Sequence, residues 1–429
     1  MNLMYSIVWY LLLPPLWLVF VGKMLSGKPG YTRERLSRFG LFKTTLTNST
    51  LLWHCVSVGE VVCVTPLIKK LLATDPNLTI TITTTTATGA EQVHKTFDAR
   101  VQHCFLPYDC GWLMRRLLNR ISPRAILITE VELWPNLINT ANRRGIPIAL
   151  INARMTDRSA RNYAKLGRFF SGTVNQIRMI SAQSQKDKDN YQRLGVSPDH
   201  VRNSGNIKFE LSTTRIQNLT IEHLGNVARK NNRLIVIAAS THEPEESMLL
   251  EAHKKLEASG VNLETWLVPR HPQRFEQIAS LLDQSNVGYL RYSQLTEQAP
   301  VTHNEKIVLI DAMGVLNAAF AEADVAFIGG SFAEKGGHNA LEAALYKLPV
   351  VMGPSQFNNP EIYQQLRSVF NLSTANNQSE LEKALLNWCE NTEQRLAAGN
   401  AGYSVINQNR GALATTQHLI NALIDDTDD

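Results

Sequence analysis

Short apolar runs alternate along the chain with longer segments in which apolar residues recur every three or four positions. The short runs are typical of buried strands, and the longer period is typical of helices that pack on one face. From residue 51 onward this pattern predicts strands at 51–58, 78–86, 101–107, 124–130, 146–154 and 179–184. Helices are expected between them, at 59–75, 88–97, 110–121, 134–145 and 159–174.

A second series of the same kind follows the polar stretch LSTTRIQNLT, which begins just after Glu210. Its expected strands are 233–240, 264–270, 287–293, 306–311, 324–330 and 348–353, with helices such as 245–259 and 337–347 between them. Strand–helix alternation implies parallel sheets covered by helices on both faces. The predicted fold is therefore α/β, with two Rossmann-like domains facing a cleft, at residues 26–210 and 211–429. The last helix is expected to be able to pack back on the first domain.

The first 25 residues differ from the rest of the chain. Leu3–Gly22 carries no charged side chain and is about long enough to cross a hydrocarbon core. Five basic residues follow it, which predicts a cytoplasmic flank: Lys23, Lys28, Arg33, Arg35 and Arg38. Residues 1–25 are therefore predicted to anchor the protein to a membrane, either as a span or, because of Pro14 and Pro15, as an in-plane segment. A buried N-terminal core helix is the alternative.

Composition excludes few classes of protein. The 429 residues are 44% hydrophobic and 19% charged, with a formal net charge of +5. This mild basicity suits anionic ligands or a membrane surface, and it does not argue for nucleic acid. The five cysteines have no CxxC spacing, so reduced thiols are expected and neither a disulfide framework nor a zinc site is.

The stretch Asp324–Ala344 carries the strongest ligand signal in the second half. A strand ends in Gly329-Gly330-Ser331, and Gly336-Gly337-His338-Asn339 is expected to open a helix. Glycines allow a ligand to approach the backbone, and a helix start attracts an anion. Glu342 is expected one turn deeper, where its carboxylate could accept hydrogen bonds from ribose hydroxyls. The stretch therefore predicts a nucleotide site; a tight turn capped by Asn339 is the alternative.

Two further strand ends in the second half carry candidate ligand groups. AASTHEPEE places Ser240 and Thr241 before a helix, and LVPRHPQRF places Arg270 and His271 between two prolines. Capping of the helix explains most of the first stretch, and a rigid turn is the alternative for the second. Contact with a bound nucleotide is the functional interpretation of both.

In the first half, carboxylates follow two strands. WHCVSVGEV ends a strand at a glycine and then presents Glu60, and ITEVELWPNL places Glu130 and Glu132 before a helix. Acids at such positions can transfer protons, although Glu60 alone would also suit the first turn of a helix. Other candidates lie at the ends of neighbouring strands. Ser57 and Gly59 precede Glu60, Thr86 ends the strand expected at 78–86, and Arg154 and Arg161 lie at and after the end of the strand expected at 146–154. A solvated basic face is the alternative for the arginines.

Taken together, these runs resemble the 3-deoxy-D-manno-octulosonic acid (Kdo) transferases of lipopolysaccharide biosynthesis. The matching runs are HCVSVGEV, TTTTATGAEQV, ITEVELWPNLI, NARMTDRSARNYAKLG, GNIKFE, AASTHEPEE, LVPRHPQRF, DVAFIGGSF and GGHNALE. The resemblance implies a GT-B glycosyltransferase fold and inverting, metal-independent transfer of Kdo from CMP-Kdo to lipid IVA, without a cofactor. It also implies residence on the cytoplasmic face of a bacterial inner membrane.

The resemblance also implies roles for residues at matching positions. Glu60 corresponds to the family's general base, and either Glu130 or Glu132 to a second required acid. The first domain would then bind the acceptor, with Ser57, Gly59, Thr86, Arg154 and Arg161. The second would bind the donor, with Ser240, Thr241, Arg270, His271, Gly330, Ser331, Gly336, Gly337, His338, Asn339 and Glu342. The sequence departs from the family pattern at Ala87, Val315, Ala340, Ala343 and Asn359.

Two other functions fit parts of the pattern. One is a membrane-associated GT-B transferase that uses a UDP-sugar and another lipid acceptor. The other is a membrane-tethered protein that binds a nucleotide or lipid without catalysis. The first would favour UDP over CMP, and the second predicts that Glu60→Gln leaves function unaltered.

Overall fold

The computed structural model of the chain describes residues 2–28, 31–43, 45–211, 218–285, 287–295 and 304–425. These residues form two compact units. Unit 1 comprises Met1–Glu210 and Asn409–Asp429, and unit 2 comprises Leu211–Gln408. Part of the polar stretch expected to separate the two halves, residues 212–217, lies outside the described residues.

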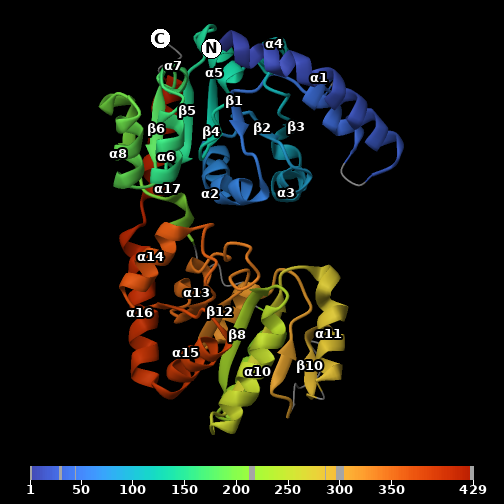
Figure 1. Ribbon diagram of the computed structural model, residues 1–429, viewed down its shortest axis with the longest axis vertical. Coiled ribbons are helices and arrows are strands. Elements are labelled where there is room, and N and C mark those ends of the chain that lie inside the picture. Colours follow the sequence, from blue (N-terminus) through green and yellow to red (C-terminus); the bar gives the residue numbers. More distant parts are fainter. Residues whose placement is uncertain are drawn as a thin grey trace. The chain divides into compact units, whose positions relative to one another are not determined.

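Unit 1 is built on a parallel sheet, with helices on both faces (Figure 1). Its described strands lie in the order β3-β2-β1-β4-β5-β6-β7. Their bounds are β1 Leu51–His54, β2 Ile80–Thr84, β3 Gln102–Phe105, β4 Ala125–Thr129, β5 Ile148–Ala153, β6 Met179–Ala182 and β7 Val201–Asn203. The helices are α1 Asn2–Leu25, α2 Val58–Thr74, α3 Ala87–Phe97, α4 Gly111–Ile121, α5 Pro135–Asn142, α6 Asp157–Ala164, α7 Arg168–Val174, α8 Gln185–Arg193 and α17 Ala412–Asp425.

Alternation along the strands divides the core of unit 1 into two layers. In β1, Leu52 packs into one cluster with α4, α5 and α8, whereas Leu51 and Trp53 pack into another with α2, α3 and α17. Successive side chains of a strand point to opposite faces, so a strand buried on both faces must be apolar throughout. This explains the continuous apolar runs that predicted the sheet.

Unit 2 repeats this architecture. Its described strands form a parallel sheet in the order β10-β11-β9-β8-β12-β13-β14. The strands are β8 Leu234–Thr241, β9 Leu263–Pro269, β10 Tyr289–Arg291, β11 Ile307–Leu309, β12 Val325–Ile328, β13 Val350–Met352 and β14 Leu372–Thr374. The helices are α9 Leu219–Lys230, α10 Glu245–Ala258, α11 Phe275–Gln284, α12 Leu316–Glu322, α13 Leu341–Leu345, α14 Pro360–Ser368, α15 Gln378–Glu390 and α16 Thr392–Gln408. The predicted α/β fold with two Rossmann-like domains is confirmed.

Two local features were not anticipated. The segment expected to be one helix at 159–174 forms two, α6 and α7, because Gly167 between them adopts a φ of 49°. The helix expected to begin at Gly336–Asn339 begins only at Leu341. The last helix, for which a return to the first domain was considered, is α17: it packs against α2 of unit 1, where its Ala412, Ile420 and Leu423 join the core layer that contains Leu51 and Trp53 of β1.

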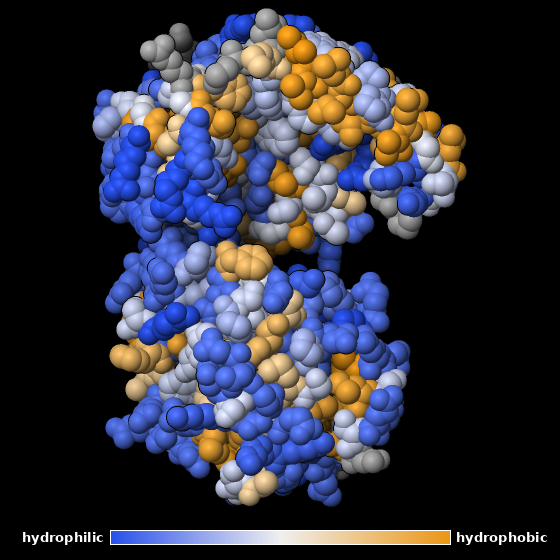
Figure 2. Space-filling model, viewed as in Figure 1, coloured by the Kyte–Doolittle hydropathy of each residue, from blue (hydrophilic) through white to orange (hydrophobic). Residues whose placement is uncertain are grey.

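Helix α1 runs along the outside of unit 1, and Figure 2 shows hydrophobic side chains gathered over it. Met4–Leu25 has a mean hydropathy of 1.8, and only 6% of its most apolar stretch is buried. Pro14 and Pro15 lie within this one continuous helix. The helix meets the length and composition required of a membrane segment.

Candidate functional site

Glu60 lies at the carboxyl end of the sheet of unit 1. It is the third residue of α2, which begins directly after β1. Strand β1 pairs in parallel with β4, with Trp53 opposite Leu127, so the two strands end at the same edge. Glu130 and Glu132 follow β4 at that edge. The sheet register therefore brings together the three acids that were predicted from separate motifs.

Burial makes Glu60 an unusually weak acid. Loss of hydration, together with the nearby Glu130 and Glu132, raises the pKa of its carboxyl to about 8. The Val56 N–H, which donates to Glu60 Oε2 at 2.7 Å, and Lys208 oppose this shift. Burial and Glu130 also raise the pKa of Glu132, to about 7. A carboxylate whose pKa lies near neutral pH is suited to accept a proton.

Lys208 completes this cluster and was not assigned from the sequence. Its Nζ lies 3.1 Å from Glu130 Oε1, although it is 78 residues away along the chain. Glu130 adopts a φ of 58°, a left-handed conformation that is uncommon for a residue with a side chain. The run GNIKFE contained Lys208, but only the fold reveals its partner.

The backbone of Val56 joins two of the predicted motifs. Its carbonyl accepts hydrogen bonds from the hydroxyls of Thr85 and Thr86, both at 3.2 Å. Thr86 also caps α3 by accepting from Gly89 N, while Ser57 and Gly59 form the first turn of α2. The structure thus places Ser57, Gly59 and Thr86 beside Glu60.

The two predicted arginines lie on the next strand–helix connection. Arg154 directly follows β5 and is half-buried, whereas Arg161 is exposed on α6 near Asp157. No described contact joins Arg161 to the acids. Acceptor binding by these arginines stays a prediction.

His54 and Trp134 were not predicted and lie at the same edge. Their rings are 6.1 Å apart, and burial lowers the pKa of His54 to about 3. Among the described residues, His54 Nε2 and Trp134 Nε1 are buried without a hydrogen-bond partner. The position of His54 immediately before the CVSVGE run was the available sequence signal.

In unit 2, the glycine-rich loop after β12 is held by Glu245. This carboxylate is fully buried and accepts hydrogen bonds from the N–H groups of Gly330, Ser331 and Phe332, at 2.8–2.9 Å. It also accepts one from His242 N. Gly329 approaches so closely that a Cβ would collide with the backbone of Ser240 and Thr241. The run AASTHEPEE contains Glu245, but its partners on the loop after β12 lie 85–87 residues away along the chain.

These contacts correct the predicted role of the loop. Gly336 N donates to Ser355 Oγ at 3.1 Å, Gly337 N to Gly330 O at 2.9 Å and His338 N to Gly329 O at 3.0 Å. Glu245 accepts from the N–H groups of Gly330 and Ser331 as well. Most of the backbone N–H groups in the glycine-rich stretch are therefore hydrogen-bonded within the chain. Ser331 is fully buried, and its hydroxyl donates to Ile328 O. In this structure, the loop is fixed by its own hydrogen bonds, and most of its N–H groups do not point freely to solvent.

Three histidines and Arg270 gather beside this support. His242 Nε2 and His338 Nε2 lie 2.9 Å apart, and the rings of His242 and His271 are 5.2 Å apart. Burial, followed by the charge of Arg270, lowers the pKa of His338 to about 4. Arg270 and His271 are exposed at the end of β9. This group offers cationic and neutral hydrogen-bond donors to an anion.

The remaining donor-side candidates lie around this group. Ser240 and Thr241 end β8, so they do not cap α10 as expected. Ser240 has a φ of 57°, and the buried Thr241 Oγ1 has no partner among the described residues. Burial raises the pKa of Glu342, which Arg270 opposes. Asn339 Oδ1 accepts from Leu341 N at 3.2 Å at the start of α13.

One set of side chains has the composition of a metal site. The ligand atoms of Glu34, His94 and His103 lie within 4.8 Å of one another. However, the Lys43 ammonium lies 3.5 Å from the same Glu34 oxygen that faces both histidines. The three groups and this lysine satisfy one another, so the cluster is explained without an ion.

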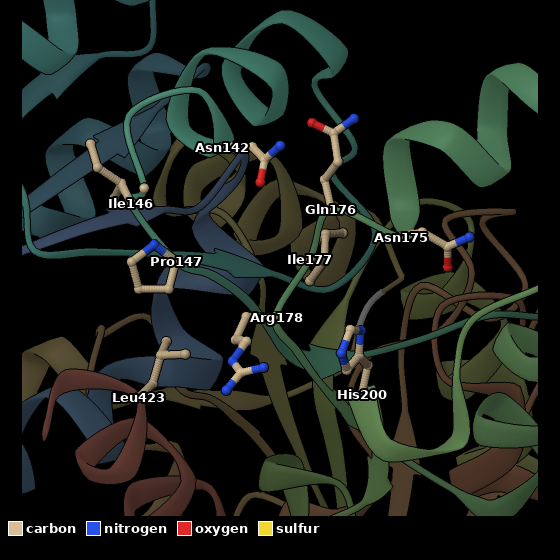
Figure 3. Close-up of a pocket in the computed structure, with 10 residues that line it drawn as sticks. Asn142, Ile146, Pro147, Asn175, Gln176, Ile177, Arg178, His200 and Leu423 are labelled. Carbon is tan, nitrogen blue, oxygen red and sulfur yellow. The ribbon is translucent and has the colours of Figure 1, made fainter. Parts of the chain in front are cut away.

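A cavity of about 700 Å³ lies at the opposite edge of the sheet of unit 1. Figure 3 shows side chains around it, including Pro147 and Arg178, which directly precede β5 and β6, and His200. The acids lie at the carboxyl ends of the strands, so this cavity is separate from their site.

Comparisons with known proteins agree with the resemblance. Residues 33–211 match a family model described as 3-Deoxy-D-manno-octulosonic-acid transferase (kdotransferase). The 3-deoxy-D-manno-octulosonic acid transferase of Haemophilus influenzae is 38% identical over 96% of both chains. That of Bordetella pertussis is 35% identical over 71% of both. A UDP-GlcNAc 2-epimerase structure from Neisseria meningitidis shares the fold, with a TM-score of 0.55 at 14% identity over 87% of this chain and 99% of that one.

The fold is therefore GT-B-like, and the identity to full-length relatives settles the family. The chain belongs to the 3-deoxy-D-manno-octulosonic acid transferases, the glycosyltransferases of lipopolysaccharide biosynthesis.

Proposed function

We propose that the chain transfers Kdo from CMP-Kdo to lipid IVA with inversion, without a metal, and with Glu60 as the general base. The observation that carries this proposal is the half-buried Glu60 carboxyl at the carboxyl end of the sheet, whose pKa is about 8. It belongs to unit 1, whereas the candidate anion-binding group belongs to unit 2. Relatives named for Kdo transfer supply the sugar.

The proposed step is a single displacement at the anomeric carbon. The acceptor hydroxyl oxygen forms a bond to that carbon while the bond from the carbon to the phosphate oxygen breaks. The bonding electron pair leaves with CMP, and Glu60 takes the hydroxyl proton. Attack opposite to the leaving group inverts the configuration. Glu130, paired with Lys208, and Glu132 set the charge around the base.

On the donor side, we assign the leaving phosphate to side chains rather than to loop amides. Arg270 and His271 are exposed beside His338, so a guanidinium and imidazoles can bind and neutralise a monophosphate. Thr241 and Glu342 then face the nucleoside, where Glu342 would accept hydrogen bonds from ribose hydroxyls. The loop Gly330–Asn339 supports these groups through Glu245.

We further propose that α1 lies in the plane of the cytoplasmic leaflet of the inner membrane. Its beginning is held on unit 1 by Tyr5, and its end by Trp17 and Phe20, whose rings pack 4.8 Å and 5.4 Å from that of Phe39. A helix held at both ends by one domain does not cross a bilayer. Its outward face is apolar (Met4, Ile7, Val8, Leu11, Leu12, Leu18, Val19 and Leu25), and basic residues follow it.

The direct test uses purified protein with CMP-Kdo and lipid IVA, and the product mass as readout. We expect a mass increase of one or more Kdo residues; failure to add any Kdo, under conditions in which a known Kdo transferase is active, rejects the proposal. Thermal-shift measurements with CMP and UDP address the rival UDP-sugar transferase. Preferential stabilisation by UDP would favour that rival.

A further inference from the structure

Asp109 lies between the membrane-facing helix and the loop that carries two of the acids. It follows β3 and is fully buried. Its Oδ2 accepts hydrogen bonds from the Tyr5 hydroxyl of α1 and from Asn136 N, both at 2.9 Å, and its Oδ1 accepts from Leu137 N at 2.9 Å. One carboxylate thus bridges α1 and α5.

Asp109 caps α5 from a distance. Asn136 and Leu137 are the second and third residues of that helix, whose N–H groups have no partner within a helix. Trp134, at the N-cap position, provides no side-chain cap. A buried carboxylate that accepts from two such N–H groups fixes the start of the helix and complements its dipole.

A second pair of contacts reinforces this link. The Ser6 hydroxyl of α1 donates to Asn136 Oδ1 at 2.9 Å, and Asn136 Nδ2 donates to the Asp109 carbonyl at 2.5 Å. Ring contact between Trp9 and Tyr108, at 5.7 Å, extends the same junction. Helix α1 is therefore joined to the first turn of α5 through both Asp109 and Asn136.

The acid loop is held at both of its ends. It runs from β4, which ends at Thr129, to α5, which begins at Pro135, and it contains Glu130 and Glu132. The sheet holds one end, and Asp109 holds the other. A shift of α5 relative to β4 would therefore displace Glu132, which contributes to the electrostatic environment of Glu60.

We propose that Asp109 is a positioning residue that couples α1 to the acid loop, so that lodging α1 in an anionic lipid surface orders the acids for transfer. The inference rests on the proposed function in assigning these acids to the reaction. In solution, the outer apolar side chains of α1 are exposed and have no packing partner among the described residues, although its inner side contacts unit 1. In lipid, α1 is immobilised. Because Tyr5 and Ser6 are hydrogen-bonded to Asp109 and Asn136, the first turn of α5 becomes less mobile as well.

The test removes the hydrogen bonds between α1 and the Asp109–Asn136 pair and leaves Glu60, Glu130 and Glu132 unchanged. Tyr5→Phe/Ser6→Ala removes two hydroxyls on the inward side of α1 and leaves its outward face intact. The matched control, Tyr403→Phe/Ser404→Ala, removes the same two groups from a consecutive Tyr–Ser pair on α16 of unit 2. Binding to vesicles that contain phosphatidylglycerol, measured by co-sedimentation, is expected to be equal in all three proteins.

Hydrogen–deuterium exchange gives a readout independent of activity. Adding these vesicles to the wild type is expected to slow exchange in peptides covering residues 130–140 about threefold or more, because Asn136 and Leu137 amides open less often. The control should behave like the wild type, and Tyr5→Phe/Ser6→Ala should lose the effect. Unchanged exchange at 130–140 in a wild type whose α1 is protected by vesicles would overturn the proposal.

Kinetics give the second readout. For Tyr5→Phe/Ser6→Ala on vesicles, we expect kcat to fall about tenfold, as two lost hydrogen bonds allow, with KM for CMP-Kdo unchanged. Values equal to those of the control contradict the coupling. If the wild type adds no Kdo at all, the proposed function fails, but the exchange experiment still decides whether α1 and the acid loop are coupled.

Discussion

The two units both have a parallel sheet of seven described strands arranged around their first strand, but they carry opposite chemistry at the carboxyl ends of the strands. Each has a central strand, β1 or β8, flanked by the strand that follows a crossover, β4 or β12. In unit 1 the carboxyl ends carry Glu60, Glu130 and Glu132, whereas in unit 2 they carry Arg270 and three histidines. The carboxyl ends of a parallel sheet therefore form a common location for ligand-binding side chains. The residues that follow each strand determine the charge of that location.

The units also position these groups by opposite means. In unit 1, a cation, Lys208, lies 3.1 Å from one of the acids and moderates their repulsion. In unit 2, an acid, Glu245, is buried beneath the cationic group and binds only backbone N–H groups in the described contacts. The non-glycine residues Glu130 and Ser240 adopt similar left-handed conformations, with φ of 58° and 57°, at the ends of β4 and β8. Both sites thus contain backbone strain held by the surrounding sheet.

The largest expected effect comes from removing the charge of the proposed base in unit 1. Glu60→Gln should lower kcat about 1,000-fold, since general-base catalysis contributes on the order of 100- to 10,000-fold. The dissociation constant for CMP-Kdo should not change, because the donor group lies in unit 2. Steady-state kinetics and calorimetry measure the two quantities, with Glu91→Gln on the exposed face of α3 as control. Unaltered kcat would favour the non-catalytic rival.

The next effect is on the stability of unit 2. Glu245→Gln places an amide NH₂ opposite backbone donors in a fully buried position, so the free energy of unfolding should fall by about 3 kcal/mol. Denaturant unfolding measures this loss, and affinity for CMP should fall with it. Glu251→Gln, on the exposed side of α10, should change neither. A stable Glu245→Gln protein with normal affinity would show that the loop does not depend on this carboxylate.

A smaller effect concerns pH and stability. The folded state raises the pKa of Glu60 from an ordinary 4.5 to about 8, so it binds the proton more tightly than the unfolded chain does. Glu60 therefore costs the folded protein stability as pH rises from about 4.5 to about 8, and the cost is constant above that range. Glu60→Gln should therefore stabilise the protein at pH 9, where Glu60 is ionised, but have little effect at pH 4.5. Thermal unfolding at both values measures the difference; an equal effect at the two pH values would contradict the raised pKa.

The smallest expected effect is the loss of one exposed cation from unit 2. Arg270→Ala should weaken CMP binding about tenfold, as expected for one charge-assisted hydrogen bond at a solvated site. Isothermal titration calorimetry with CMP measures the change, and Arg100→Ala on unit 1 is the control. Equal affinity in both variants would remove Arg270 from the donor site.

Most of the fold could be predicted from sequence because its signals are local. Strands buried on both faces, such as 125–129, must be apolar throughout, and amphipathic helices repeat between them. The break between α6 and α7 was missed because a single glycine, Gly167, decides it through its φ. The late start of α13 was missed because the hydrogen bonds that hold the loop come from Ser355 and from Gly329 and Gly330.

The positions of the candidate residues were predictable only where a residue lies at or shortly after the end of a strand. Glu130 and Arg270 directly follow β4 and β9, and Glu60 lies in the first turn of the helix after β1, so the parallel register brings each of them to the carboxyl end of its sheet. Lys208 and Glu245 act through partners 78 and more than 80 residues away, so no local pattern reveals them. The intramolecular hydrogen bonds of the loop amides were not predictable for the same reason, because their acceptors are set by the folded loop.

The return of α17 to unit 1 has a consequence for synthesis of the protein. Ala412, Ile420 and Leu423 complete the core layer that also contains Leu51 and Trp53. A ribosome must translate all of unit 2 before these residues emerge, so unit 1 cannot finish folding while unit 2 already can. The part of this layer that α17 covers therefore stays exposed in the nascent chain for most of its synthesis, at the time when α1 is already available to reach the membrane.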